Sequence, residues 1–187
     1  MLETARLKLR PWKPEDLDPF AALCADETVM EHFPSTLTRA RSAEVIEEFL
    51  QRTDEDGFAP WAVESRHTGD FLGFVGLMRV GFASHFTPAV EIGWRLARAA
   101  WGHGYATEGA KAALHQAFET LGLPELVSFT SQPNKRSRSV MERIGMTRNP
   151  EDDFLHPRLP EGDPLRPHVL YRLQAEEWRR RPPGAPA

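Results

Sequence analysis

The sequence predicts a single α+β domain, in which helices cover both faces of a mixed, mostly antiparallel sheet. Short runs of alternating apolar and polar residues indicate strands, and longer runs with apolar residues every three or four positions indicate helices. The order of the two kinds of run along the chain favours one layered α+β fold. With 187 residues, 41% of them hydrophobic, the chain is long enough to bury one core.

In the first half of the chain, residues 7–12 are predicted to form a strand, and helices are predicted from residue 14 onward and at residues 42–52. Three further strands are predicted at residues 61–64, 71–77 and 89–96. Pro14 suits the first turn of a helix, and Gly57 ends the region of the second helix. That second helix is expected to turn four apolar residues inward, Val45, Ile46, Phe49 and Leu50. Residues 67–70 have hairpin-turn chemistry, so the three later strands predict an antiparallel meander.

The second half is predicted to contain a helix to about residue 121, a strand, a short helix and a last strand, the last three at 126–130, 134–144 and 168–173. Gly122 and Pro124 prevent the first of these helices from continuing. Residues 174–187 form a tail rich in arginine and proline at its end, and we expect it to be partly disordered.

Composition excludes several classes of protein. The chain has 23 basic and 27 acidic residues, a net charge of -4, which argues against a protein that coats nucleic acid or an anionic membrane. Cys24 is the only cysteine, so an intrachain disulfide and a thiolate metal cluster are both excluded, and no other spacing indicates a metal site. Because no signal peptide or membrane-spanning run is present, we expect a cytoplasmic protein.

Residues 98–108 carry the most chemical information, because they leave a predicted strand and open a predicted helix. A helix N-terminus has unpaired backbone N–H groups and a partial positive charge, which together attract anions. Gly102 and Gly104 lack a Cβ atom, so a phosphate can approach the backbone closely. The segment therefore predicts a phosphate site, although two glycines alone fit a turn without a ligand equally well.

Three linked segments resemble one known family. Residues 101–109, Trp-Gly-His-Gly-Tyr-Ala-Thr-Glu-Gly, resemble the coenzyme A pyrophosphate loop of the GNAT acetyltransferase superfamily, in particular the branch that acetylates the N-termini of ribosomal proteins at serine or alanine. Residues 91–96 resemble the fourth strand of that branch, and residues 133–146 resemble its last helix. The resemblance extends over about residues 7–173. It implies an N-acetyltransferase that uses acetyl-CoA as co-substrate and acetylates a primary amine.

Two positions depart from the family pattern. The family has Gln or Arg three residues before the first glycine of the loop, where this chain has Ala99 with Arg98 beside it. Backbone amides make the main contacts in such a loop, so the motif is weakened without losing its physical basis. Met141 occupies the place of a tyrosine that serves many relatives as a general acid, which excludes a tyrosine acid from that helix.

By the same resemblance, the cofactor contacts come from the strand, the loop and the last helix. The expected residues are Trp94, Arg95, Leu96, Arg98, Trp101, Gly102, His103, Gly104, Tyr105, Ala106, Thr107, Asn134, Arg136 and Ser137. A backbone N–H beside residues 94–96 is expected to polarise the thioester carbonyl. For the charged side chains in this set, a solvated helix face is the competing interpretation.

Acyl transfer from a thioester to an amine needs a neutral amine, a polarised carbonyl and a proton for the departing thiolate. The resemblance implies that Glu91 is the base, acting through a water molecule, that Asn134 binds the pantetheine arm, and that Ser137 protonates the thiolate. Each has a structural alternative, respectively a surface carboxylate, a helix N-cap and an exposed helix serine. We expect direct transfer in a ternary complex, with Cys24 packed in a helix face and carrying no acyl group.

The sequence narrows the acceptor amine only to a protein N-terminus or a small molecule. Aromatic and histidine residues in variable loops are expected to border its cleft, or else to close a small core: Phe33, Phe82, His85, Phe86, Phe154 and His156. A non-catalytic CoA-binding sensor on the same fold is the main alternative. A nucleic-acid module acting through residues 135–138 and 179–181 is disfavoured by the net charge. We expect neither a nucleic-acid nor a membrane partner, and a homodimer is compatible with the sequence.

Overall fold

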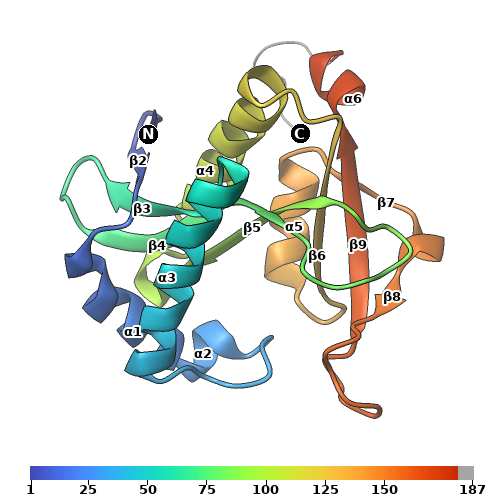
Figure 1. Ribbon diagram of the computed structural model, residues 1–187, viewed down its shortest axis with the longest axis horizontal. Helices are drawn as coiled ribbons and strands as arrows, with labels where there is room; N and C mark the ends of the chain where they lie inside the picture. Colours follow the sequence, from blue (N-terminus) through green and yellow to red (C-terminus); the bar gives the residue numbers. More distant parts are fainter. Residues whose placement is uncertain (181–187) are drawn as a thin grey trace. The chain divides into compact units, whose positions relative to one another are not determined.

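The computed structural model describes residues 1–180, which form two compact units (Figure 1). The first unit comprises Met1–Met78 and Gly93–Ala113, and the second comprises Arg79–Ile92 and the chain from Leu114 onward. Strand β5 (Val90–Leu96) begins in the second unit and ends in the first. Helix α4 (Tyr105–His115) begins in the first unit and ends in the second. Within residues 1–180 there is no helix both long enough and apolar enough to cross a membrane.

The sheet of the first unit is built from strands paired antiparallel in chain order. These are β1 (Leu2–Glu3), β2 (Leu7–Arg10), β3 (Trp61–Ser65) and β4 (Phe71–Arg79). Leu7 and Leu9 alternate along β2 and are fully buried, as the predicted strand requires. The last part of β5 lies beside β4, where the backbone N–H of Ala97 donates to the carbonyl oxygen of Leu72 at 2.9 Å.

The first unit contains several helices besides the start of α4. They are η1 (Pro14–Asp16), α1 (Leu17–Ala25), α2 (Glu27–Met30), α3 (Arg39–Asp56) and η2 (Arg98–Ala100). Asp26 caps α2 by accepting from the N–H groups of Thr28 and Val29, and Gly57 ends α3 in the left-handed conformation. Figure 1 shows α1 and α3 side by side.

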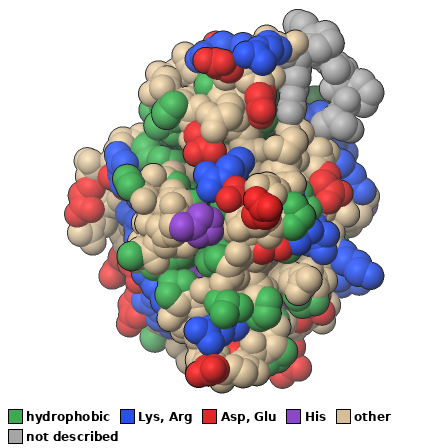
Figure 2. Space-filling model, turned by 90° about the vertical axis from the view of Figure 1, so that its right-hand side faces the viewer, with side chains coloured by type: hydrophobic (Ala, Val, Ile, Leu, Met, Phe, Trp, Pro, Cys, Tyr) green, Lys and Arg blue, Asp and Glu red, His purple; other side chains and the backbone are tan. Residues whose placement is uncertain are grey.

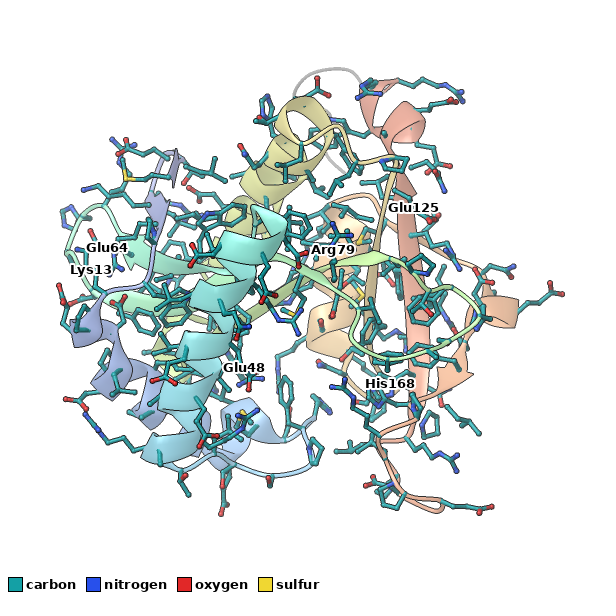
Figure 3. The ribbon with its side chains drawn as sticks, in the orientation of Figure 1. Lys13, Glu48, Glu64, Arg79, Glu125 and His168 are labelled. Atoms are coloured by element: carbon teal, nitrogen blue, oxygen red, sulfur yellow. The ribbon has the colours of Figure 1, made fainter. Side chains whose placement is uncertain are left out.

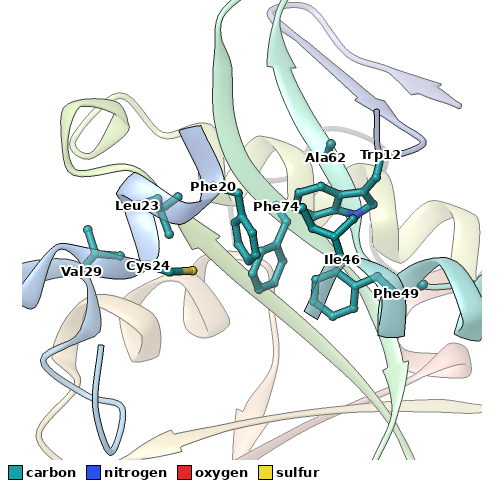
Figure 4. Close-up of a cluster of buried hydrophobic side chains, with 10 residues drawn as sticks. Trp12, Phe20, Leu23, Cys24, Val29, Ile46, Phe49, Ala62 and Phe74 are labelled. Atoms are coloured by element: carbon teal, nitrogen blue, oxygen red, sulfur yellow. The ribbon is translucent and has the colours of Figure 1, made fainter. Parts of the chain in front are cut away.

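A cluster of aromatic rings lies in the core of the first unit. Trp12 packs edge-on against Phe20 with ring centroids 5.1 Å apart, and Phe49 packs against Phe74 at 5.4 Å (Figure 4). Such edge-to-face pairs stabilise a core beyond the area that they bury. Cys24 is fully buried in the same cluster, as expected for a packed cysteine.

Three expectations about the first unit need correction. Helix α3 is longer than the predicted 42–52, and Leu50, expected to face inward, is 44% exposed. The buried stripe of α3 runs through Ser42, Ile46 and Phe49, and Leu50 lies at the edge of this stripe, where it is exposed. The predicted strand at 7–12 ends at Arg10, because Pro11 has no N–H with which to continue the ladder. Elements β1 and α2 have too few residues to show a periodic pattern.

The second unit combines one parallel pair with antiparallel pairs. The first part of β5 pairs in parallel with β6 (Glu125–Ser131), and β6 pairs antiparallel with β9 (Pro167–Gln174). Short strands β7 (Thr147–Arg148) and β8 (Phe154–Leu155) also pair with β9. The remaining elements are η3 (Gln116–Thr120), α5 (Lys135–Arg143), η4 (Pro150–Asp152) and α6 (Ala175–Arg179). The predicted class, an α+β fold with a mixed and mostly antiparallel sheet, is confirmed.

The first residues of the tail that we expect to be partly disordered form a short helix. Residues 175–179 form α6, whose Trp178 ring lies 5.9 Å from the ring of Phe118, while Arg179 Nη2 donates to the Phe118 carbonyl oxygen at 3.0 Å. The sequence pattern did not predict this helix, because the residue that α6 contacts, Phe118, is distant in the sequence. Residues 181–187, the other part of that expectation, lie outside the described residues.

Candidate active site

The predicted phosphate turn leaves a row of backbone N–H groups available in the first unit. Gly102 and Gly104 have φ angles of 80° and 79°, and α4 begins at Tyr105. The N–H of Glu108 donates to the Gly104 carbonyl at 3.0 Å, so the N–H groups of residues 105–107 precede the first helical bond. A Cβ atom at Gly102 would meet nothing within 4 Å. The backbone is therefore open on this side, which fits a pyrophosphate.

A set of contacts that sequence reasoning missed holds this turn in place. Arg6 Nε donates to Glu108 Oε2 at 2.7 Å, and Arg6 Nη1 donates to the His103 carbonyl at 2.9 Å. Thr4 Oγ1 donates to Glu108 Oε1 at 2.6 Å. Burial alone would raise the pKa of Glu108, but hydrogen bonds from Thr4 and Arg6 outweigh it and lower the pKa. The ionised carboxylate thus joins the N-terminal segment to the cofactor turn.

The turn also borders a cleft of about 840 Å³ in the first unit. Ala97, Ala99, Ala100, His103 and Tyr105 line one part of it, and residues 64–65 and 67–72 line another. Trp101 supports the turn by donating from Nε1 to the Leu96 carbonyl at 2.8 Å, and the Arg98 guanidinium lies over its ring at 4.9 Å. The charged lining includes Lys13 and Glu64, which lie next to each other at 3.9 Å (Figure 3).

Glu91 lies on β5 in the second unit, at the position paired with Val127 of β6. The residue keeps some accessible surface, but its carboxyl group is desolvated, and burial raises the pKa of Glu91 to about 8. A carboxyl group with a pKa near neutrality suits general base catalysis, because it is partly ionised and still basic at the working pH.

Helix α5 places three of the predicted residues in the second unit. Asn134 Oδ1 accepts from the Ser137 N–H at 3.1 Å, and Asn134 Nδ2 donates to Thr130 Oγ1 at 2.9 Å. The capping interpretation of Asn134 is therefore confirmed, while its role toward a cofactor stays a prediction. Ser137 is half-buried and Arg136 is exposed. Met141 is buried with 1% exposed, so it packs where many relatives are expected to place a tyrosine acid.

Arg95 is an unusual member of the predicted cofactor set. Its guanidinium lies 4.1 Å from the ring of Phe33 and 5.5 Å from that of Phe74, and Nη1 donates to Cys24 Sγ at 3.4 Å. Nε is buried without an acceptor, and burial lowers the pKa of Arg95. Removing an ion from water costs several kcal/mol, whereas a cation–π contact contributes about 0.5–2 kcal/mol. Burial of the Arg95 side chain therefore lowers the stability of the folded protein.

The loop aromatics of the second unit form a small core. Phe86 is 7% exposed and packs against Phe82, Phe129 and Phe154, with ring centroids 5.0–6.1 Å apart. His156 lies 4.8 Å from His168, and burial, aided by the charges of His168 and Arg158, lowers the pKa of His156 to about 4. The core-closing alternative is thus confirmed for these residues, which include four of the six that we expected at the acceptor cleft.

The basic runs of the nucleic-acid alternative have local partners. Arg138 donates to the Gln132 carbonyl at 3.2 Å, Arg179 lies 3.5 Å from Glu119, and Arg180 lies 3.1 Å from Glu176. Arg181 falls outside the described residues. The face seen in Figure 2 mixes acidic and basic side chains. An interspersed pattern of this kind gives little long-range attraction for a polyanion.

Comparison with known proteins decides the family. The family model described as "Acetyltransferase (GNAT) domain" matches residues 6–147, well over half of the chain. The chain belongs to the GNAT acetyltransferase family. It is an acyltransferase that uses acetyl-CoA, and the resemblance predicted from the strand, the turn and the last helix is confirmed.

Relatives of this GNAT acetyltransferase cover almost its whole length. It is 33% identical over 190 residues to the FsC-acetyl coenzyme A-N(2)-transacetylase of Aspergillus fumigatus, covering 96% of this chain and 78% of that protein. An acetyltransferase structure from Agrobacterium tumefaciens is 31% identical with a TM-score of 0.73, covering 92% and 93% of the two chains. Spermidine N-acetyltransferase from Vibrio cholerae, in complex with CoA and spermine, has a TM-score of 0.74 at 16% identity, covers 94% and 99%, and shows the fold alone.

Proposed function

We propose that this protein transfers an acetyl group from acetyl-CoA directly to a primary amine, without an acyl-enzyme. The observation that carries the proposal is the turn at 101–108, where two glycines with positive φ precede the available N–H groups of α4. That geometry is suited to the pyrophosphate of coenzyme A. When bound, acetyl-CoA supplies the activated acyl group as a thioester, and the protein supplies binding and proton transfer.

Each predicted residue has a role in this proposal. The backbone of Gly102, Gly104 and residues 105–107 binds the pyrophosphate, and the backbone at 94–96 orients the thioester arm. Asn134 binds the same arm, and Arg98, His103 and Arg136 neutralise phosphate charge. Glu91 accepts the proton of the acceptor amine through a water molecule, and its raised pKa makes it a sufficiently strong base. Ser137 donates a proton to the departing thiolate.

The burial of Cys24 supports direct transfer. Its side chain is fully buried, and its neighbours in the cluster include Phe20 and Ile46. Arg95 supplies the positive neighbour that a reactive thiolate requires, but a fully buried sulfur is not accessible to an incoming thioester. Transfer then needs only that the two substrates are held together.

The proposed acceptor is a protein N-terminus or a small molecule with a primary amine. The names of two similar proteins, a transacetylase acting at N(2) and a spermidine N-acetyltransferase, support acetylation of nitrogen. A non-catalytic CoA sensor on this fold is the second candidate. The desolvated Glu91 favours the enzyme, because a sensor has no use for a carboxyl group whose pKa is raised to about 8.

The test is release of free CoA from acetyl-CoA in the presence of an amine panel that contains peptides, amino acids, polyamines and aminoglycosides. We expect turnover with at least one amine, intersecting initial-rate lines when both substrates are varied, and no gain of one acetyl group in the intact-protein mass without acceptor. Tight acetyl-CoA binding with no turnover on any amine would support the sensor instead. Parallel lines together with an acetylated protein would overturn direct transfer.

A further inference from the structure

Arg95 has hydrogen-bonding capacity that the protein itself leaves unused. Nη1 donates to Cys24 Sγ at 3.4 Å, a weak acceptor, and Nε is buried with no acceptor. Within residues 1–180, no aspartate or glutamate forms an ion pair with this guanidinium. The unused edge of the guanidinium contains Nε and Nη2, which can donate two parallel hydrogen bonds to a single carboxylate.

Arg10 shows how the same unit treats an arginine with a structural role. Its Nη1 and Nη2 donate to the two oxygens of Asp16 at 2.7 and 2.8 Å, and its Nε donates to Glu64 Oε2 at 2.6 Å. The hydrogen bonds to Asp16 are the main reason why the pKa of Arg10 is raised, the opposite direction to Arg95. Arg10 is thus fully satisfied by the chain, whereas Arg95 lacks the anion that Arg10 has.

The surroundings of Arg95 are aromatic. Phe33 and Phe74 lie over the guanidinium at 4.1 and 5.5 Å, so its edge is left for a partner that lies in its own plane. Phe33 is 37% exposed, so a ligand that enters beside it displaces only a surface ring. His32, next to Phe33 in the chain, also keeps a buried ring nitrogen, Nδ1, without a partner. Buried polar atoms without a partner therefore occur both on Arg95 and on the residue that precedes Phe33.

We propose that Arg95 forms a subsite for a carboxylate that the acceptor amine carries, so that the substrates of this acetyltransferase are amino acids or peptides with a free carboxylate. The proposal rests on the acetyltransferase function proposed above and narrows its acceptor class. Arg95 lies on β5 directly before the segment that leads into the cofactor turn, so an acceptor held there is held by the strand that also supports the cofactor segment. The backbone of Arg95 keeps its predicted role toward acetyl-CoA, and only its side chain is assigned to the acceptor.

The first test uses the wild-type enzyme and matched acceptors, so it does not depend on a variant that folds. Glycine, β-alanine, γ-aminobutyrate and glycylglycine are compared with the corresponding amides, which keep the amine and lose the negative charge. We expect kcat/KM to be about 10–100-fold higher for the best acid than for its amide, the usual worth of a charge-assisted pair. Equal values for acids and amides, or turnover only of amines without a carboxylate, would overturn the proposal while leaving the acetyltransferase intact.

The second test assigns the preference to Arg95. Arg95→Gln should raise KM for the preferred acid about 10–100-fold more than for its amide, and Arg95→Lys should restore part of the difference. Arg39→Gln removes a positive charge from an exposed ion pair with Asp18 in the same unit, and it should keep the full preference. Acetyl-CoA affinity by calorimetry should be the same in all three variants. A preference that survives in Arg95→Gln, or a loss of acetyl-CoA affinity in that variant, would assign Arg95 elsewhere.

A binding readout separates this proposal from the proposed function. Without acetyl-CoA, the preferred acid should raise the melting temperature of the wild-type protein more than its amide does, and Arg95→Gln should abolish the difference. Stabilisation by acids without any turnover would support the subsite and reject the enzyme. Turnover of amines with no stabilisation by acids would support the enzyme and reject the subsite.

Discussion

Two charged side chains of β5, Glu91 and Arg95, are held where their charge is unfavourable. Burial raises the pKa of Glu91 to about 8 and lowers the pKa of Arg95, so both are displaced toward the neutral form. In a protein with marginal stability such residues persist when function uses them. Their functional use is testable, because each shift predicts a particular dependence on pH or on ligand charge.

For Glu91 we predict a pH–rate profile controlled by its own ionisation. With an acceptor amine of pKa ~10.4, such as a lysine side chain, two groups must lose a proton below pH 8 and only the amine between pH 8 and 10. The slope of log kcat/KM against pH should therefore decrease from two to one near pH 8. Glu91→Gln should keep only the amine limb and lose about 10²–10⁴-fold in kcat/KM. The measurement is kcat/KM from pH 6 to pH 10.

Acetyl-CoA affinity measured over the same pH range is the control, since Glu91 does not contact the phosphates in this mechanism. A wild-type profile with a single slope, unchanged by Glu91→Gln, would leave Glu91 as a structural residue.

For single residues, the sequence predicted those roles that depend on neighbouring positions in the chain. Asn134 was recognisable both as a cap and as a family position, and its cap contact to Ser137 is present. The Arg6–Glu108 contact and the orientation of the Arg95 side chain were not predictable, because their partners lie 71–102 positions away in the chain. Only the folded chain brings such groups together.

Among the elements, the turn before α4 can be tested by the conformation that its glycines adopt. Gly104→Ala should lower acetyl-CoA affinity about 10-fold, because a residue with a Cβ loses ~1–2 kcal/mol at a φ of 79° and the N–H groups shift. The Cβ itself is not the obstacle, since its nearest neighbour, Arg6 Nη2, is 3.6 Å away. Calorimetry with acetyl-CoA gives the affinity.

Gly122→Ala is the matched control for this substitution. Gly122 also has a positive φ, 64°, and a Cβ there meets nothing within 4 Å, but it follows η3 rather than the turn. Both substitutions should lower the melting temperature by similar amounts, and only Gly104→Ala should weaken binding. Equal affinities in the two variants would separate the cofactor from this turn.

The contact between the N-terminal segment and α4 predicts a further effect on the turn. Arg6→Gln removes the donor to the His103 carbonyl and the partner of Glu108, so we expect acetyl-CoA affinity to fall about 3–10-fold. Arg66→Gln is the control, because Arg66 donates to the Thr4 carbonyl and pairs with Glu3 without touching the turn. The same affinity in both variants would show that Arg6 has no part in shaping the turn.

Long elements with a clear period were predicted within a few residues, and short ones were not. Helix α3 and strand β6 have enough residues to display an apolar stripe or an alternation. Strands β7 and β8 have two residues each, and they exist only because β9 offers unpaired backbone groups. Such strands are a consequence of tertiary structure, so no local sequence pattern predicts them.

For the molecule as a whole, the raised pKa of Glu91 links its stability to pH. Between the usual pKa of 4.5 and the folded-state value of about 8, the unfolded chain loses this proton and the folded protein keeps it. The contribution of Glu91 to stability is therefore fully present below pH 4.5, falls as pH rises through that window, and is constant above pH 8. Glu91→Gln, neutral in both states, should melt about 10–20 °C higher than wild type at pH 9 and at the same temperature at pH 4.

Thermal melts of both proteins from pH 4 to pH 9 test this. A constant difference across the range would mean that packing, and not ionisation, distinguishes the variants.

The fold class was predictable because three motifs occurred in family order over most of the chain, and each motif also had a physical reason to be there. The Gly-rich turn needs positive φ, the strand ahead of it alternates, and α5 begins with an asparagine cap. The division into two compact units was not predicted, because it depends on contacts between distant segments, for which the sequence has no local signal.

The close approach of β4 to β5 has a consequence for which sequences this protein can tolerate. Gly73 has a φ of 131°, and a Cβ there would lie 2.2 Å from the carbonyl oxygen of Arg95 and 2.7 Å from Leu96 Cα. Both obstacles are backbone atoms, so no change of rotamer can relieve the clash. In a library randomised at codon 73, every amino acid other than glycine forces the backbone at 95–96 to move. Selection for acetylation should therefore return glycine codons at this position, even though Gly73 itself needs to touch neither substrate.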